Sequence, residues 1–199
     1  MKKFSVGISL TTIAEVNKGF LAYHNDMFRT TIRLDEIRSP HFWELYYSGR
    51  GQLLAERWHD FYRLYFDGMT HPVPDAPEAI PFLLRRYEDV CIFVDCHNQH
   101  VDIIRDWIMA HFNGWRPTLC FTRYHDVVVP MPHLSAAYGI DGHVEDNPES
   151  AEGIAYMAGG VILPTRPWNE DYELEIVERV LDWDEITDAI EAIKRSQAA

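Results

Sequence analysis

The chain has 199 residues, 47% of them hydrophobic and 25% charged, which is the usual balance of a globular protein. Acidic residues outnumber basic ones by 31 to 18, so the formal net charge is −13. A charge of that sign repels a nucleic-acid backbone, and we expect no nucleic-acid partner. Because no run of eighteen apolar residues occurs and the first residues lead straight into a strand, we also expect no membrane partner and a cytoplasmic location.

The chain begins with a predicted strand from Phe4 to Ile8, followed by small polar residues and a helix. Three helical patterns rich in aromatic residues follow, over residues 15–28, 34–47 and 53–66. Prolines at positions 72, 74 and 77 interrupt the helical pattern. Residues 15–71 are therefore predicted to be a helical insertion between the first strand and the rest of the fold.

From residue 76 onward, predicted helices and strands alternate. The helices are expected over residues 76–87, 101–112, 134–138, 148–158 and 183–195, and the strands over 90–94, 118–121, 142–144 and 161–163. Such alternation predicts an α/β fold, with a parallel sheet and right-handed crossovers. The three cysteines, Cys91, Cys96 and Cys120, lie in or beside the apolar strands without CxxC spacing, so we interpret them as small buried side chains.

Polar residues follow four of the predicted strands. These clusters are Gly7 to Thr12, Asp95 to Asn98, Arg123 to Asp126 and Glu145 to Asn147. Ligands of open α/β sheets bind at the carboxyl ends of the strands, where these clusters should meet. The sequence therefore predicts a site at this edge, although the first strand brings no acid, thiol or lysine to it.

Several segments resemble the haloacid dehalogenase-like phosphatases, and within them the deoxyribonucleotidase-like branch. The segments are GFLAYHNDMF, DEIRSPHFWE, PVPDAPEAIPFLL, CIFVD, FTRYHD, GIDGHVEDNPESA, GGVILPTRPWNEDYE and ERVLDWDEI. The resemblance implies a three-layer Rossmann-like parallel sheet with a small helical cap inserted after the first strand. It implies a core domain of residues 1–14 and 72–199 and a cap of residues 15–71.

The resemblance also implies which positions would carry the family's chemistry, and most of them have changed. The family's aspartate nucleophile and its general-acid aspartate correspond to Gly7 and Ser9. The hydroxyl residue that holds the phosphoryl group corresponds to Asp95, and the lysine corresponds to His125. The metal-binding acid is retained as Asp146, with Glu145 beside it.

These replacements remove the basis for phosphoryl transfer by the family's route. Gly7 has no side chain that could form an aspartyl-phosphate. Asp95 would place a carboxylate beside the phosphoryl group, and two unit charges about 4 Å apart at an effective dielectric near 20 repel by about 4 kcal/mol, or roughly three orders of magnitude in affinity. We therefore predict that aspartyl-phosphate phosphatase activity is absent.

Two functional hypotheses remain open. The first is a pseudoenzyme, a degenerate 5'-nucleotidase homologue that binds a small molecule, such as a nucleotide, or a protein partner. Its predicted ligand contacts are Phe42, Trp43, Asp95 and His97, where Phe42 and Trp43 correspond to base contacts of nucleotidases and Trp58 and Phe61 are assigned to packing.

The second hypothesis is a repurposed metal-dependent hydrolase acting on nucleotide-like substrates. Asp95, His97, His125, Glu145 and Asp146 could together bind a divalent metal such as Mg²⁺ or a transition metal, with Asp146 and Glu145 as the family's metal position. No local motif fixes their spacing, and each has a structural alternative such as helix capping or solvent exposure, so we expect no resident cofactor. Ser9 as a nucleophile with His97 or His125 as its base is a further alternative, but no GxSxG turn surrounds it.

Overall fold

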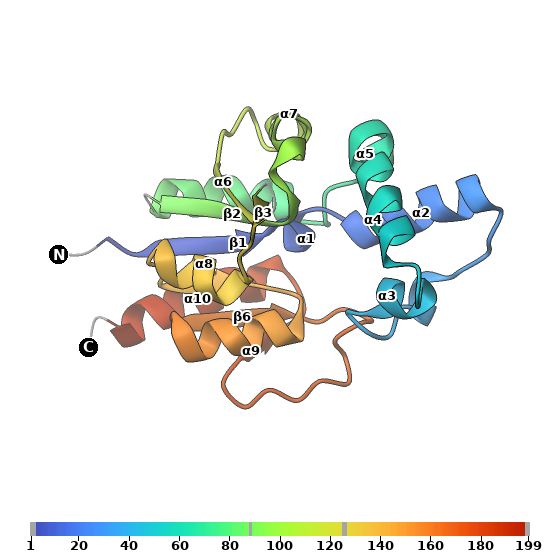
Figure 1. Ribbon diagram of the computed structural model, residues 1–199. Coiled ribbons are helices and arrows are strands. Elements are labelled where there is room, and N and C mark those ends of the chain that lie inside the picture. Colours follow the sequence, from blue (N-terminus) through green and yellow to red (C-terminus); the bar gives the residue numbers. More distant parts are fainter. Residues whose placement is uncertain (1–2, 88, 125–126, 198–199) are drawn as a thin grey trace.

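The protein is described here from a computed structural model, which covers residues 3–87, 89–124 and 127–197 (Figure 1). Its centre is a seven-stranded sheet in the order β4-β3-β2-β1-β5-β6-β7. The strands are β1 (Ser5–Ser9), β2 (Asp89–His97), β3 (Thr118–Tyr124), β4 (Val127–Val128), β5 (Gly142–Val144), β6 (Gly160–Pro164) and β7 (Glu178–Val180). Neighbouring strands are parallel except β3 and β4, so the predicted α/β fold is confirmed.

Helices cover both faces of the sheet. The helices of this part are α1 (Leu10–Ile13), α6 (Ala76–Arg86), α7 (Val101–His111), α8 (Met131–Ala137), α9 (Pro148–Met157) and α10 (Trp183–Gln197), with the 3-10 turn η3 (Asn98–His100). Side chains of β1 and β2 such as Ile8 and Ile92 belong to one apolar cluster with α6, α7 and α10. Phe93 and Leu163 belong to a second cluster with α8 and α9. The alternation of side chains along the strands thus supplies two cores, as a three-layer fold requires.

The aromatic-rich helices lie together at the carboxyl end of β1, on the right in Figure 1. This helical segment consists of α2 (Val16–Phe28), the 3-10 turn η1 (Leu34–Glu36), α3 (Phe42–Tyr46), α4 (Gly51–Asp60), the π-helical turn η2 (Phe61–Tyr65) and α5 (Phe66–Met69). Its interior is aromatic, because Phe20 stacks on Trp58 at 3.7 Å between ring centroids and meets Trp43 edge-on at 4.7 Å. The chain leaves and returns side by side, joined by the bridge between Ala14 and Pro72.

Three expectations from the sequence need correction. The predicted helix over 34–47 is wrong in its centre, where the chain bends at Ser39 and Pro40 and leaves only η1 and α3 helical. The strands β2 and β3 run past their apolar residues, so Asp95 and His97 lie within β2 and Arg123 within β3 rather than after them. The short strands β4 and β7 have too few residues for an alternating pattern and were not predicted. Within the described ranges, no helix is both long and apolar enough to cross a membrane.

Candidate functional site

The carboxyl ends of β1 and β5 bring four polar side chains together. The Ser9 hydroxyl donates a hydrogen bond to Glu145 Oε2 at 2.6 Å, and the Thr11 hydroxyl donates one to Asp146 Oδ1 at 2.5 Å. Ser9, Glu145 and Asp146 are all at least 97% buried, with 2%, 3% and 3% of their surfaces exposed. The predicted convergence of the first and fourth polar clusters therefore occurs in the structure.

Burial sets the electrostatics of the acid pair, Glu145 and Asp146. It raises the pKa of Glu145 to about 8, with a further increase from the charge of Asp146, while the bonds from Ser9 and from the Asn147 N–H lower it. Burial likewise raises the pKa of Asp146, against the Thr11 hydrogen bond and the charge of Arg166. The second carboxylate oxygen of Asp146, Oδ2, is buried without a hydrogen-bond partner among the described residues. Both acids thus lie in an environment that favours a proton or a nearby cation.

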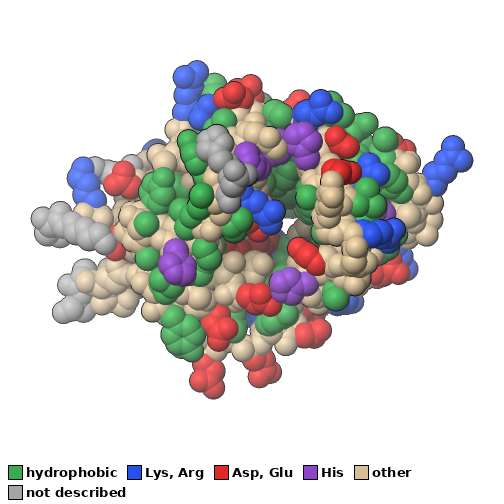
Figure 2. Space-filling model, in the orientation of Figure 1, with side chains coloured by type: hydrophobic (Ala, Val, Ile, Leu, Met, Phe, Trp, Pro, Cys, Tyr) green, Lys and Arg blue, Asp and Glu red, His purple; other side chains and the backbone are tan. Residues whose placement is uncertain are grey.

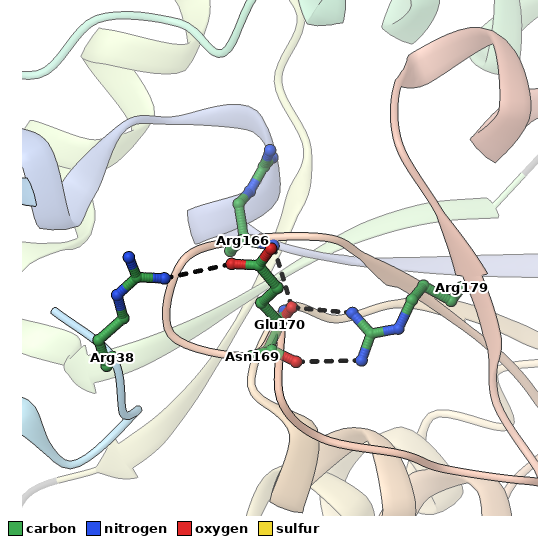
Figure 3. Close-up of polar contacts among 5 residues, drawn as sticks. All are labelled: Arg38, Arg166, Asn169, Glu170 and Arg179. Carbon is green, nitrogen blue, oxygen red and sulfur yellow. Dashed lines mark hydrogen bonds and ion pairs between the residues drawn. The ribbon is translucent and has the colours of Figure 1, made fainter. Parts of the chain in front are cut away.

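Two asparagines fix the backbone around the acid pair. The Asn147 side chain caps α9 by accepting the N–H groups of Glu149 and Ser150. The Asn169 side chain, which is fully buried, donates to the carbonyl oxygens of Asp146 and Pro164, both at 2.9 Å. Its Oδ1 atom accepts from the Arg166 N–H and the Arg179 guanidinium, as Figure 3 shows. The loop after β6 is thereby attached to the segment that carries Asp146.

Gly7 lies inside β1, two residues before the strand ends. A Cβ atom at this position would stand 2.8 Å from His143 Nδ1 and 2.9 Å from a ring carbon of Phe93, closer than such atoms approach one another. His143 is fully buried, so its pKa falls to about 3 and the ring is neutral at physiological pH. The His143 ring therefore fills the space beside Gly7, and Ser9, which is also buried, is the last residue of the strand.

The other predicted site residues are more scattered. Asp95 is exposed and accepts a hydrogen bond from Thr122 at 2.5 Å, although its charge still adds to the raised pKa of Glu145. His97 accepts the Gln99 N–H and caps η3. His125 lies outside the described residues. For Ser9, the described partner is Glu145 and not a histidine, so the arrangement of a serine nucleophile with His97 as its base is not present.

The predicted aromatic ligand contacts are mainly packed within the helical segment. Trp43 is 4% exposed and lies against Phe20, while the half-buried Phe42 ring packs on Trp43 and Tyr46. Trp58 stacks on Phe20, in agreement with its assignment to packing. Contact of Phe42 or Trp43 with a ligand stays a prediction, and for Trp43 it would require the helical segment to rearrange.

A hollow runs between the helical segment and the sheet-bearing part in the space-filling view, with acidic, basic and histidine side chains around it (Figure 2). An ion pair from Arg38 to Glu170 at 3.2 Å and a hydrogen bond between His41 Nε2 and Glu149 Oε1 at 2.8 Å cross between these parts. On another side, the Gln99 side-chain amide lies 3.0 Å from His59 Nδ1. The two parts therefore meet through polar contacts at these points, in addition to apolar packing such as that of Phe66 on Trp107.

One cavity lies at this junction and a second lies beside it within the sheet-bearing part, and neither is lined by Glu145 or Asp146. The first, of about 200 Å³, is lined by residues of α1 and α2, by Val73 and Pro74, and by residues 165–168 after β6. The second, of about 170 Å³, shares Val73, Pro74 and Arg166 with the first. Arg166 was not predicted from the sequence, because polar clusters were expected after four strands and not after Val161 to Leu163, which Arg166 soon follows.

The carboxylate oxygens of Glu145 and Asp146 are only partly available to coordinate a metal ion. Three of its four carboxylate oxygens already accept bonds from Ser9, Thr11 and the Asn147 N–H, which leaves Asp146 Oδ2 open. Within residues 3–87, 89–124 and 127–197, no three His, Cys, Asp or Glu side chains are grouped so that they could hold a metal ion. The five-residue metal set predicted from the sequence is thus not assembled, as far as its described members show.

Comparison with known proteins gives the fold. No family model matches the chain. No curated protein matches it either. Among solved structures, a haloacid dehalogenase-like hydrolase from Bacteroides fragilis has a TM-score of 0.62 and 13% identity, and the match covers 90% of this chain and 97% of that one. A haloacid dehalogenase-like family protein from Streptococcus pneumoniae has a TM-score of 0.66 and 8% identity, with coverages of 94% and 97%. A HAD hydrolase of family IA, variant 3, from Entamoeba histolytica has a TM-score of 0.65 and 11% identity, with coverages of 96% and 99%. The chain therefore has the fold of the haloacid dehalogenase-like hydrolases.

Proposed function

We propose that this protein is a catalytically degenerate relative of the haloacid dehalogenase-like phosphatases, which binds a small molecule between its helical segment and its sheet-bearing core. In this proposal the helical segment acts as a cap over the carboxyl edge of the sheet. Aspartyl-phosphate chemistry is absent, and the protein acts by binding its ligand rather than by hydrolysing a phosphate ester.

The proposed loss of phosphatase activity rests on the residues at the end of β1. The carboxyl end of β1 carries the buried Ser9, whose hydroxyl donates a hydrogen bond to Glu145 at 2.6 Å, and the Gly7 position has no room for a side chain. A covalent phosphatase of this type needs a carboxylate nucleophile on that strand. The acids that are present, Glu145 and Asp146, belong to the neighbouring strand end and are held by hydroxyl groups, so neither is placed as a free nucleophile.

Binding at the junction is supported by the first cavity, whose lining comes from both the helical segment and the core. The contacts from Arg38 to Glu170 and from His41 to Glu149 lie at the surface between cap and core, and the residues that form them do not line the first cavity. Nucleotide binding, which the resemblance of the sequence implies, is one version of this proposal, and recognition of a protein partner is the alternative if no small molecule binds.

The proposal is tested by combining a turnover assay with a binding panel on the full chain. With p-nitrophenyl phosphate and Mg²⁺ we expect no turnover above that of an Asp146→Asn variant. In thermal unfolding, at least one member of a panel of nucleosides, nucleotides and small organic acids is expected to raise the Tm, because a ligand at 100 times its Kd adds about 2.7 kcal/mol to the stability. Turnover that depends on Asp146 would overturn the degenerate assignment, and a panel without any stabilising member would overturn small-molecule binding.

A divalent metal at the acid pair is the second candidate, favoured by the buried and unpartnered Asp146 Oδ2. Asp146 and Glu145 would hold the ion, which would neutralise two carboxylates whose burial opposes their ionisation. Metal analysis of protein purified without chelator checks this candidate. An equimolar ion that is lost in Asp146→Asn would establish it, whereas a trace content unchanged by added Mg²⁺, Mn²⁺ or Zn²⁺ would remove it.

A further inference from the structure

Arg166 carries a positive charge that the described protein does not pair. Its backbone N–H bonds to Asn169, but its guanidinium makes no hydrogen bond or ion pair with any described residue. In Figure 3 the side chain extends away from the contacts among Asn169, Glu170 and Arg179. It is only half-buried and acts on Asp146 through its charge alone. A guanidinium with five donors that is left open beside a cavity is a ready partner for a carboxylate.

The cavity in front of Arg166 is small and mostly apolar. Its volume is about 200 Å³, and its apolar walls include Val16, Leu34, Val73 and Trp168. An apolar cavity of about 150 Å³ holds a benzene ring, whereas drug-sized ligands occupy sites of roughly 300–1,000 Å³. The space therefore suits a ring or short aliphatic body with one polar group.

The charged residues around the cavity favour a ligand that carries a single negative charge. Lys18 and Glu15 both line it but pair with each other at 3.0 Å, so Arg166 is the remaining cation of the lining. On its other side, Arg166 faces the second cavity, whose lining includes Asp75 and Asp182. These carboxylates, Asp146 and the overall charge of −13 would oppose a second negative charge on the ligand.

We propose that this cavity binds a small organic monocarboxylate, with its carboxylate on the Arg166 guanidinium and its apolar body against Trp168. This inference rests on the proposed function, since it names the class of small molecule that the junction between cap and core would take. Thr11 lines the same cavity and donates its hydroxyl to Asp146, so one side chain connects the wall of the cavity to the acid pair.

Benzoate is the probe that tests the inference, with benzamide as its neutral counterpart of the same shape. We expect benzoate to raise the Tm of the full chain in a concentration-dependent way and to bind at least about tenfold more tightly than benzamide, as a charge-assisted hydrogen bond predicts. In Arg166→Gln the affinity for benzoate is expected to fall by at least about tenfold as well. The Arg166→Lys variant, which keeps the charge but loses the two-pronged geometry, should bind with an intermediate affinity.

The matched control is Arg116→Gln, an exposed arginine before β3 at the opposite edge of the sheet, which should bind benzoate as the unmodified protein does. Urea unfolding of each variant without ligand establishes that it is folded before its affinity is compared. Equal binding of benzoate and benzamide, no loss in Arg166→Gln, or tighter binding of inorganic phosphate than of benzoate would each overturn the inference. If benzoate fails while a nucleoside or nucleotide of the wider panel binds, only this inference falls, and if no compound binds, the proposed function falls with it.

Discussion

At the scale of the residue, Gly7 is explained by its neighbour on the adjacent strand. Gly7 pairs with His143 across β1 and β5, and the His143 and Phe93 rings occupy the space that a side chain at position 7 would need. The Phe93 and His143 rings are 4.7 Å apart between centroids, so the sheet is filled locally by aromatic contact. Glycine is required here by close packing and not by backbone conformation.

The Gly7→Ala variant should therefore lose about 1–3 kcal/mol of stability, because its methyl group overpacks a filled core. Urea unfolding measures this loss. Gly68→Ala is the control, since a Cβ there meets nothing within 4 Å, and it should be neutral or slightly stabilising in its helix. Equal stabilities of the two variants would contradict the packing explanation. Gly7→Asp should be worse than Gly7→Ala, so an acid introduced at this position is not expected to create phosphatase activity.

At the scale of the element, the loop between β6 and β7 is attached to the site by one side chain. Asn169 uses both ends of its amide, donating to Asp146 and Pro164 and accepting from Arg166 and Arg179. The next residue, Glu170, pairs with Arg38 of the helical segment (Figure 3). The same loop thus contacts the acid pair, the wall of the first cavity and the cap.

Asn169→Ala should cost about 2–5 kcal/mol, because it leaves several buried donors and acceptors without partners. Glu170→Ala is the neighbouring control and removes only an ion pair whose side chains are 56% and 61% exposed, so a loss of about 0–1 kcal/mol is expected. Chemical denaturation of both variants gives the comparison. A loss in Asn169→Ala as small as that in Glu170→Ala would show that the loop is held by other contacts.

At the scale of the whole molecule, buried titratable groups set how stability depends on pH. The folded protein keeps a proton on Glu145 up to about pH 8, whereas an unfolded chain releases it near the ordinary value of 4.5. The stability from this group is therefore present at low pH and is lost as the pH rises toward 8. The effect of His143 on stability has the opposite sign. Burial lowers the pKa of His143 from 6.5 to about 3, so the protein loses stability as the pH falls below 6.5. Between 4.5 and 6.5 the two effects oppose each other, and above 6.5 that of Glu145 prevails.

We expect the free energy of unfolding to fall by up to about 1.4 kcal/mol per pH unit between pH 6.5 and 8. Glu145→Gln should flatten this decline, because a glutamine amide can donate to Ser9 and accept from the Asn147 N–H without ionising. Urea unfolding at pH 6, 7 and 8 measures it. Glu152→Gln, on the exposed side of the adjacent helix α9, should keep the decline. A decline that persists unchanged in Glu145→Gln would assign it to other groups.

How far the sequence predicts the structure depends on the range of the interactions involved. The strand over Gly142 to Val144 was predicted with its observed bounds, since turn and helix-cap signals lie on either side of this short segment. The bounds of the helix expected over 34–47 were not predicted correctly. The apolar spacing is continuous across this segment, but the chain bends at Ser39 and Pro40. The acid pair could be proposed from its place after a strand. Its pairing with Ser9 and Thr11 depends on the strand register, and that register is formed between residues about 135 positions apart.

By itself, the sequence determined the alternation of strands and helices, the aromatic insertion and the absence of a carboxylate on the first strand, because these depend on local pattern and residue identity. The tertiary structure decided that Gly7 is sealed by His143, that Trp43 is packed inside the cap, and that Arg166 is left unpaired, among the described residues, beside a cavity. These outcomes depend on which distant side chains share a volume or a low-dielectric environment. Such proximity is created only when the sheet assembles.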